Sequence, residues 1–248
     1  MTNDIILQTY GFTDIGRIRS NNEDNFGLTD NVFIIADGMG GHNAGEIASK
    51  LTVDNILNFL NLEFSKINEV KDFKGMIYRA INKTNQIVFK KSMENINLNG
   101  MGTTVVIAIF QKPKIMHIVN VGDSRAYLLR NDKLKMLTED HTLSVNLYRQ
   151  NYISKEELDK HPYRNQLTRA IGLNSTVEPY FTSLNISVGD KLLLCSDGLW
   201  NSLSNNVLKS HLQNDKSPKN ICYDLINSAK NSDGTDNITA IVIDVLSK

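Results

Sequence analysis

The grouping of apolar and polar residues along the chain predicts a mixture of strands and helices. Apolar runs bounded by turn residues predict strands at 5–10, 26–36, 103–110, 114–121, 125–130, 134–138, 190–196 and 237–245. Apolar residues at helical spacing predict helices at about 44–64, 70–93, 204–213 and 217–230. Because strands and helices come in groups and do not alternate one by one, the pattern indicates an α+β fold.

The connections between these elements carry further information. Gly122-Asp123-Ser124 and Asn131-Asp132 are short enough to predict hairpins within an antiparallel sheet. Residues 139–170 are polar and mixed in charge, and Ser154-Lys155-Glu156-Glu157 is a capping box that predicts a short helix there. We interpret this segment as a surface excursion and a candidate lid over a site. No linker, repeat or low-complexity stretch divides the chain, so we expect one domain over residues 1–248.

Composition narrows the class of protein. The chain has 248 residues, of which 41% are hydrophobic and 22% charged, as in an ordinary soluble protein. Its 27 basic and 27 acidic residues balance, which gives no general attraction to nucleic acid or to anionic membranes. We find no membrane-spanning run and no signal peptide, and Cys195 and Cys222 form neither a metal nor a disulfide pattern. These features predict a cytoplasmic protein with Cys195 as a buried thiol.

Three aspartates lie at the ends of apolar runs, each beside a turn residue. Asp37 and Asp197 each precede a glycine, and Asp236 precedes Asn237 and the last apolar run. Each pair alone is more typical of a turn than of a ligand. An ionised carboxylate at the mouth of a core strand is costly to bury unless it is paired or bound to a cation. Three such residues together favour a rim that binds hard metal ions.

The wider set of candidate acids supports a phosphate-hydrolysing site. Its members are Glu23, Asp24, Asp37, Asp123, Asp197 and Asp236. Oxygen ligands suit Mg²⁺ or Mn²⁺, and the absence of a His/Cys cluster argues against zinc. Two such ions about 3.5–4 Å apart can share a water and lower its pKa, which suits hydrolysis of a phosphate ester.

Such chemistry also needs a cation for the phosphate oxygens and an acid for the leaving group. Arg19 and His42 are candidates for these roles. Either could equally be an ordinary surface residue, and Arg17 competes with Arg19. A nucleotide loop at residues 38–45 is disfavoured because no Gly-Lys-Ser/Thr follows the glycines. Neither cysteine begins the phosphate loop of a thiol phosphatase.

Six motifs in order resemble the metal-dependent protein phosphatases of type 2C, in their single-domain bacterial form. They are residues 13–24 (TDIGRIRSNNED), 36–42 (ADGMGGH), 100–104 (GMGTT), 121–125 (VGDSR), 196–198 (SDG) and 235–239 (TDNIT). Each motif alone is weak, but their order and spacing fit from near residue 8 to residue 245. Trp200 departs from the bacterial form, in which a smaller residue is frequent at this position.

The resemblance implies a role for each matching residue. Asp37 bridges two metal ions and the Gly38 carbonyl binds the second. Asp197 and Asp236 complete the first ion's protein ligands, and Glu23 and Asp24 hold metal-bound waters. Asp123, with Asp197, holds the third ion of many bacterial members, with Asn165 nearby. Arg19, four residues before Glu23, binds the substrate phosphate, and His42 is the general acid.

The resemblance also implies a fold and a function. The fold is a four-layer sandwich of two central antiparallel sheets flanked by pairs of helices, with a flap at about 142–168. The function is hydrolysis of phosphoserine and phosphothreonine in proteins, with Mn²⁺ or Mg²⁺, in opposition to a cognate Ser/Thr kinase. We expect a monomer with no nucleic-acid partner. Two alternatives stay open: a non-catalytic module that binds phosphoproteins, and a phosphatase dedicated to one regulator such as an anti-sigma antagonist.

Overall fold

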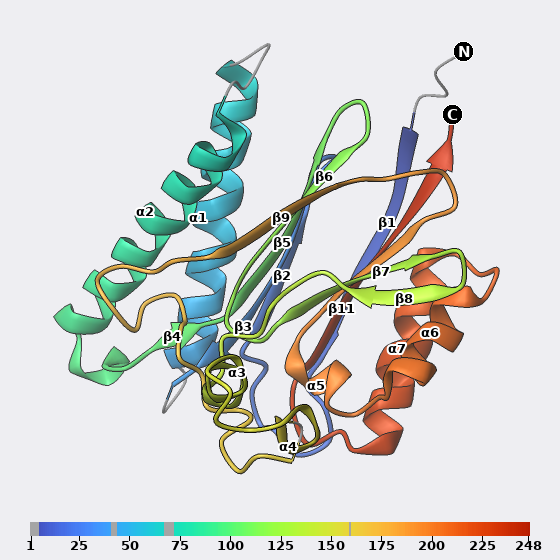
Figure 1. Cartoon of the computed structure of the whole chain (residues 1–248). Helices are drawn as coiled ribbons and strands as arrows, with labels where there is room; N and C mark the ends of the chain where they lie inside the picture. The colour runs from blue at the N-terminus through green and yellow to red at the C-terminus, as the bar shows by residue number, and fades with distance from the viewer. Residues whose placement is uncertain (1–4, 41–43, 67–71, 159) are drawn as a thin grey trace.

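The computed structural model describes residues 5–40, 44–66, 72–158 and 160–248. Two antiparallel sheets lie at its centre (Figure 1). One sheet has the order β1-β11-β10-β7-β8, with bounds Ile5–Asp14, Ile238–Ser247, Lys191–Cys195, Arg125–Arg130 and Lys133–Met136. The other has the order β2-β3-β5-β6-β9, with bounds Asp24–Leu28, Val32–Met39, Val105–Gln111, Ile115–Val121 and Tyr180–Asn185. The short strand β4 (Gly102–Thr103) also pairs with β3.

Helices cover the outer faces of both sheets, which completes the expected four-layer sandwich. Two long helices, α1 (Ala44–Lys66) and α2 (Phe73–Glu94), pack on the sheet that contains β3 (Figure 1). Three helices, α5 (Asp197–Trp200), α6 (Asn205–Gln213) and α7 (Pro218–Ser232), pack on the sheet that contains β11. The short helices α3 (Leu143–Arg149) and α4 (Lys155–Leu158) lie outside these layers (Figure 1). The short helix η1 (Ile96–Leu98) follows α2 and adds Leu98 to the cluster under α1 and α2. No helix in the described ranges has both the length and the apolar character needed to cross a bilayer.

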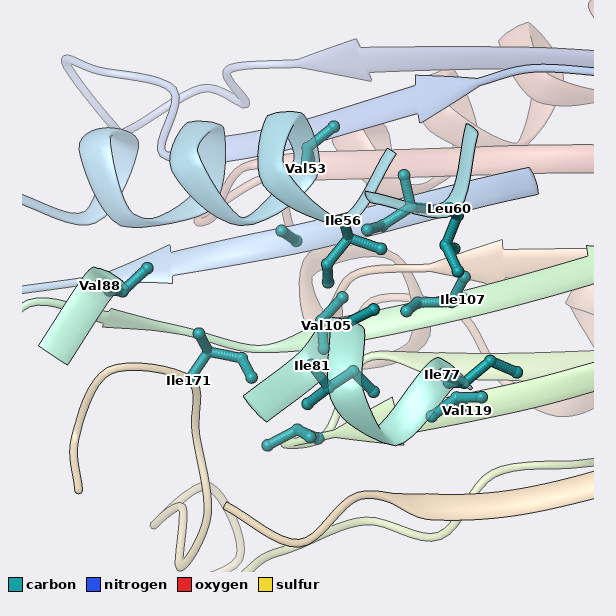
Figure 2. Packing of buried hydrophobic residues seen from close by; sticks show 14 of the residues in the cluster. Val53, Ile56, Leu60, Ile77, Ile81, Val88, Val105, Ile107, Val119 and Ile171 are labelled. Atoms are coloured by element: carbon teal, nitrogen blue, oxygen red, sulfur yellow. The ribbon is translucent and has the colours of Figure 1, made fainter. Parts of the chain in front are cut away.

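Three apolar clusters hold the layers together. Phe33 and Ile241 belong to the middle cluster, where the two sheets face each other. The cluster under α1 and α2 joins residues such as Ile56 and Ile77 to Ile107 on β5 (Figure 2). Burial of many aliphatic side chains, at about 25 cal/mol per Å² of apolar surface, is the main stabilising force of such a core. The apolar stripes seen in the sequence are therefore packing faces, as expected.

Most predicted elements are present, and several local features are confirmed. The β7–β8 hairpin turns at Asn131 and Asp132, which have φ values of 48° and 58°. The capping box is formed, since the Ser154 N–H donates to Glu157 Oε2 at 2.7 Å and the Glu157 N–H donates to Ser154 Oγ at 3.3 Å. Cys195 is a buried free thiol on β10.

Three expectations were wrong, and one strand was not predicted. The run 26–36 forms two strands, β2 and β3, because a turn at residues 29–31 folds it back on itself. The first strand continues beyond residue 10 to Asp14, since it pairs with β11 along its whole length. Strand β9 was missed, because it is an edge strand whose side chains are at most partly buried. Residues 122–124 do not make a hairpin: β6 and β7 belong to different sheets, so the chain crosses between the sheets there.

Candidate metal centre

The candidate acids are collected at one end of the sandwich by the strands that precede or follow them. Asp24 and Asp37 face each other as paired residues of β2 and β3. Asp123 lies in the crossing between the two sheets, and Asp236 lies two residues before β11. Asp197 does not end a strand but begins the one-turn helix α5, two residues after the end of β10. Five separate segments of the fold therefore bring carboxylates to one end of the sandwich.

Most of the candidate residues line one cavity of about 380 Å³. Those that line it are Arg19, Glu23, Asp37, Gly38, Asp123, Asn165, Asp197 and Asp236. Apolar side chains, including Leu167 and Leu173, complete its wall. Asp24 lies behind the cavity, where it is buried. His42 lies outside the described residues, as does Gly41.

Burial and mutual repulsion make these acids hard to ionise. Burial raises the pKa of Asp37 well above its ordinary value, and the neighbouring carboxylates of Asp24 and Asp197 raise it further. Burial likewise raises the pKa of Asp24 to about 7 and that of Asp197 to about 6. The pKa of Asp123 is raised first by burial and then by the charge of Asp197. A divalent cation would favour the ionised form of every one of these groups.

The hydrogen bonds of Asp24 leave room for such a cation. Its Oδ2 accepts from Ser196 Oγ at 2.7 Å and from Thr239 Oγ1 at 2.6 Å. Its Oδ1 is buried without a hydrogen-bond partner. An unpartnered buried carboxylate oxygen is rare and costly, so this atom fits a site that takes a cation or cation-bound water. The donor set as a whole offers oxygen atoms, which suits Mg²⁺ or Mn²⁺.

The carboxylates do not form a closed cage. Within the described ranges, no group of three or more His, Cys, Asp or Glu side chains is arranged so that it could hold a metal ion by itself. Mg²⁺ in proteins commonly keeps several waters and takes only one or two carboxylates directly. Main-chain oxygens can serve as well. At Gly38 a Cβ would lie 2.2 Å from the Gly45 carbonyl oxygen, so only glycine fits where β3 passes the start of α1.

The two candidate arginines lie in different surroundings. Arg19 lines the cavity, where its Nη2 donates to Asp236 Oδ2 at 2.8 Å. Arg17 is held outside it: its Nη2 donates to Asn231 Oδ1 at 2.6 Å, and its main-chain N–H donates to the Gly234 carbonyl at 2.7 Å. A guanidinium at the rim of an acidic cavity balances part of its charge and can meet an incoming anion.

The sequence from residue 18 to residue 218 matches the family model of protein phosphatase 2C. The chain belongs to the protein phosphatase 2C family. The serine/threonine phosphatase stp of Listeria welshimeri is 39% identical over 237 residues, which cover 94% of this chain and 93% of that protein.

Solved structures agree in fold. The crystal structure of the serine/threonine phosphatase PstP/Ppp from Mycobacterium tuberculosis matches with a TM-score of 0.89 at 32% identity, and the match covers 98% of this chain and 100% of that chain. A structure of the catalytic domain of PstP in complex with two manganese ions has a TM-score of 0.86 at 31% identity, with 98% and 100% covered.

Sequence reasoning missed the residues that hold the acids in place in this 2C-family chain. Thr104 binds both main-chain groups of Asp37: its Oγ1 accepts from the Asp37 N–H at 3.1 Å, and its N–H donates to the Asp37 carbonyl at 2.8 Å. Thr104 Oγ1 also lies 2.7 Å from Ser124 Oγ, which ties Asp37 to the crossing that carries Asp123. The only sequence signal was their position inside or next to the family motifs.

Asn237 has a similar supporting role at the other side of the cavity. Its Oδ1 accepts from the Glu23 N–H at 2.8 Å, and its Nδ2 donates to the carbonyls of Ile15 and Asn21, both at 3.0 Å. One side chain therefore fixes the loop that carries Arg19 and Glu23 against the start of β11. No pattern in the sequence predicts a contact between residues so far apart along the chain.

The flap of this 2C-family chain is anchored next to Asp123. The His141 N–H donates to the Gly122 carbonyl at 2.9 Å, and the Thr168 N–H donates to the His141 carbonyl at 2.8 Å. An isolated bridge pairs Thr142 with Leu167. Helices α3 and α4 lie between these anchors, and Asn165 reaches the cavity. The polar excursion expected from the sequence thus lies beside the acidic cavity.

Proposed function

We propose that this chain is a metal-dependent serine/threonine protein phosphatase whose centre is the acidic cavity. The observation that carries the proposal is the meeting of Asp37, Asp123, Asp197 and Asp236 with Arg19 in one cavity of a 2C-family chain. Membership of the family favours catalysis over a module that merely binds phosphoproteins. The face-to-face sheets and the extent of the family match support a single catalytic domain over residues 1–248.

The residues around the cavity fit a pair of Mn²⁺ or Mg²⁺ ions. Asp37 would serve both ions and the Gly38 carbonyl the second. Asp197 and Asp236 would serve the first. Glu23 and Asp24 would hold water on the ions, in keeping with the unpartnered Oδ1 of Asp24. Asp123 would join Asp197 in holding a third ion, with Asn165 nearby. When bound, the ions supply an activated water and offset the charge of the phosphate.

The protein's own groups would bind and orient the phosphoester. Arg19 presents its guanidinium fork to the phosphate oxygens, which aligns the phosphorus above the carboxylates. Its contact with Asp236 holds the side chain over the cavity. His42 would donate a proton to the departing serine or threonine oxygen. The wall formed by Leu167 and Leu173 limits water at the apolar side of the site.

Which phosphoproteins this chain hydrolyses depends on flap and surface contacts outside the metal centre. Phosphoproteins are the substrate class of the family, and a cognate Ser/Thr kinase, a monomeric state and a cytoplasmic location stay predictions. A phosphatase dedicated to one regulator would use the same centre, so a comparison of phosphoproteomes with and without the gene would separate the two possibilities.

Metal removal tests the proposal directly. We expect chelation of the purified chain to abolish hydrolysis of a phosphothreonine peptide, and added Mn²⁺ to restore it, because the carboxylates cannot activate water by themselves. Circular dichroism before and after chelation would verify that the fold persists. Undiminished turnover after complete metal removal would refute the proposed function.

A further inference from the structure

Trp200 joins two parts of the chain that carry candidate ligands. It ends the one-turn helix α5, which Asp197 begins, and the turn is closed by the Asn201 N–H donating to the Asp197 carbonyl at 2.8 Å. Residues three apart on a helix lie on the same face. The position of the indole is therefore tied to the position of Asp197.

The indole of Trp200 also contacts the crossing between the two sheets. Its Nε1–H donates to the main-chain carbonyl of Asp123 at 3.0 Å, although the two residues are 77 positions apart. An indole has one N–H and no acceptor, so this is the one hydrogen bond that the ring can donate. Trp200 thus links the backbone that carries Asp123 to the helix that carries Asp197.

Arg125 fixes the orientation of the indole ring. Its guanidinium carbon lies 3.4 Å from the centre of the ring, in a cation–π contact. The guanidinium is itself held by Asp140, with Nη2 to Oδ2 at 2.6 Å, and by the Tyr127 hydroxyl at 3.1 Å from Nη1. Because the Arg125 guanidinium is held in place and stacks on one face of the indole, the ring has little freedom to turn its N–H away from Asp123.

The link opposes a repulsion that would otherwise separate the two acids. Asp123 and Asp197 line the same cavity, where Asp123 is buried and Asp197 is partly buried. Like charges in a poorly solvated site repel strongly. The crossing at 122–124 belongs to neither sheet. Its ends are held by the hydrogen bonds of Gly122 with His141 and of Ser124 with Thr104, and its middle by the bond from Trp200 to the Asp123 carbonyl.

We propose that Trp200 is a positioning residue, which holds Asp123 and Asp197 at the spacing that a third divalent cation needs. The inference deepens the proposed function and rests on it, because it assumes that these carboxylates bind metal. In this role Trp200 does not contact the substrate. The indole N–H binds the backbone of Asp123, which is assigned to the third ion alone, so its loss should weaken the third ion far more than the paired ions.

The decisive variant is Trp200→Phe, which keeps an aromatic ring under Arg125 and removes the N–H. Calorimetric titration of Mn²⁺ into the metal-free chain would separate the tight sites from the weakest one. We expect the weakest site to lose about tenfold in affinity, the equivalent of one hydrogen bond, and the tight sites to change less than twofold. Tyr223→Phe is a matched control, since it removes one aromatic hydrogen bond, to Tyr10 at 3.0 Å, far from the cavity.

The outcomes distinguish this inference from the proposed function. A wild-type chain that binds no Mn²⁺ would refute the proposed function itself. A wild-type chain that binds two ions only, or a Trp200→Phe variant with an unchanged third site, would overturn the role of Trp200 and leave the paired centre intact. An equal loss in the Tyr223→Phe control would show a general effect of stability and would also overturn it.

The natural protein offers a second test that needs no variant at Trp200. The chain contains one tryptophan, so its indole emission reports on this position alone. With Mg²⁺, which does not quench fluorescence paramagnetically, we expect the emission to change with the weakest binding phase. Asp123→Asn should remove that phase. Emission that follows only the tight ions, or does not change, would contradict the proposal even if Trp200→Phe failed to fold.

Discussion

Two groups of aspartates in this protein are equally buried but have opposite surroundings. Asp140 and Asp190 are 7% and 3% exposed, while Asp24 and Asp123 are 4% and 5% exposed. Asp140 and Asp190 are each held by an arginine at 2.6 Å, from Arg125 and Arg130 respectively. Burial raises the pKa values of the other two, and neighbouring carboxylates raise them further.

The difference shows what each group contributes. The charge of each paired aspartate is balanced by an arginine within the fold. Breaking such a pair leaves an uncompensated buried ion. The acids of the cavity repel one another and weaken the metal-free fold. Arg19 offsets one of them, Asp236, at the rim. Function, rather than stability, explains a cluster of this kind.

The largest expected effect follows from changing the acid at the centre of the cluster. Asp37→Asn should lower turnover on the order of a thousandfold, since it removes the charge shared by the paired ions. The metal-free variant should melt no lower than the natural protein, because a like charge is lost. Peptide dephosphorylation and thermal unfolding measure the two effects.

A matched control for this variant is Asp54→Asn on the outer face of α1. Asp54 is exposed and pairs only weakly, at 3.6 Å, with Lys50. We expect its turnover to match that of the natural protein. If Asp37→Asn kept turnover within tenfold of the natural protein, Asp37 would have to be removed from the metal centre.

The same substitution at a paired aspartate should act on stability alone. Asp190→Asn weakens two bonds from Arg130, at 2.8 Å and 2.6 Å. We expect the free energy of unfolding to fall by about 2–3 kcal/mol, below the full value for a buried pair because the Arg130 side chain is 37% exposed. Urea unfolding measures the loss, and turnover per folded molecule should be unchanged. A loss of metal affinity here would mean that the two groups of aspartates are not independent.

Much of the fold and most acids of the cavity could be predicted from the sequence. Apolar runs and helical stripes predicted most strands and the four main helices, because burial in layers imposes their spacing. The acids of the cavity were found because an aspartate at the end of an apolar run carries a local signal, as at Asp37-Gly38, although both of these residues lie within β3. Strand β9 was not predicted, since an edge strand whose side chains are only partly buried or exposed lacks a clear apolar run.

Contacts between distant segments could not be predicted in the same way. The sequence Gly122-Asp123-Ser124 looks like a hairpin turn, and only the pairing of whole sheets shows that it is a crossing. The link from Trp200 to Asp123 and the support of Asp37 by Thr104 depend on such packing. Supporting residues of this kind have no spacing rule of their own.

The smallest expected effect is also the most diagnostic, because its sign is opposite to that of Asp190→Asn. The pKa of Asp24 is about 7 in the folded chain, raised first by burial, against an ordinary value of 3.8. Protonated Asp24 therefore stabilises the metal-free fold fully below pH 4, and this contribution is lost as the pH rises through 7. In the Asp24→Asn variant the side chain at this position is an amide, which stays neutral over the whole pH range.

The variant should accordingly gain stability relative to the natural protein as the pH rises from 4 to 8. The gain should reach about 1–2 kcal/mol, below the full linkage value for this pKa difference, because relaxation and water penetration lower the cost of a buried charge. Urea unfolding of both metal-free proteins across this range measures the difference, and the histidine titrations common to both cancel. Saturating Mn²⁺ should reverse the order at pH 8, because the ions stabilise the natural carboxylate. A difference that stayed constant with pH would show that Asp24 is ionised at little cost, and the contrast with Asp190 would then have no electrostatic basis.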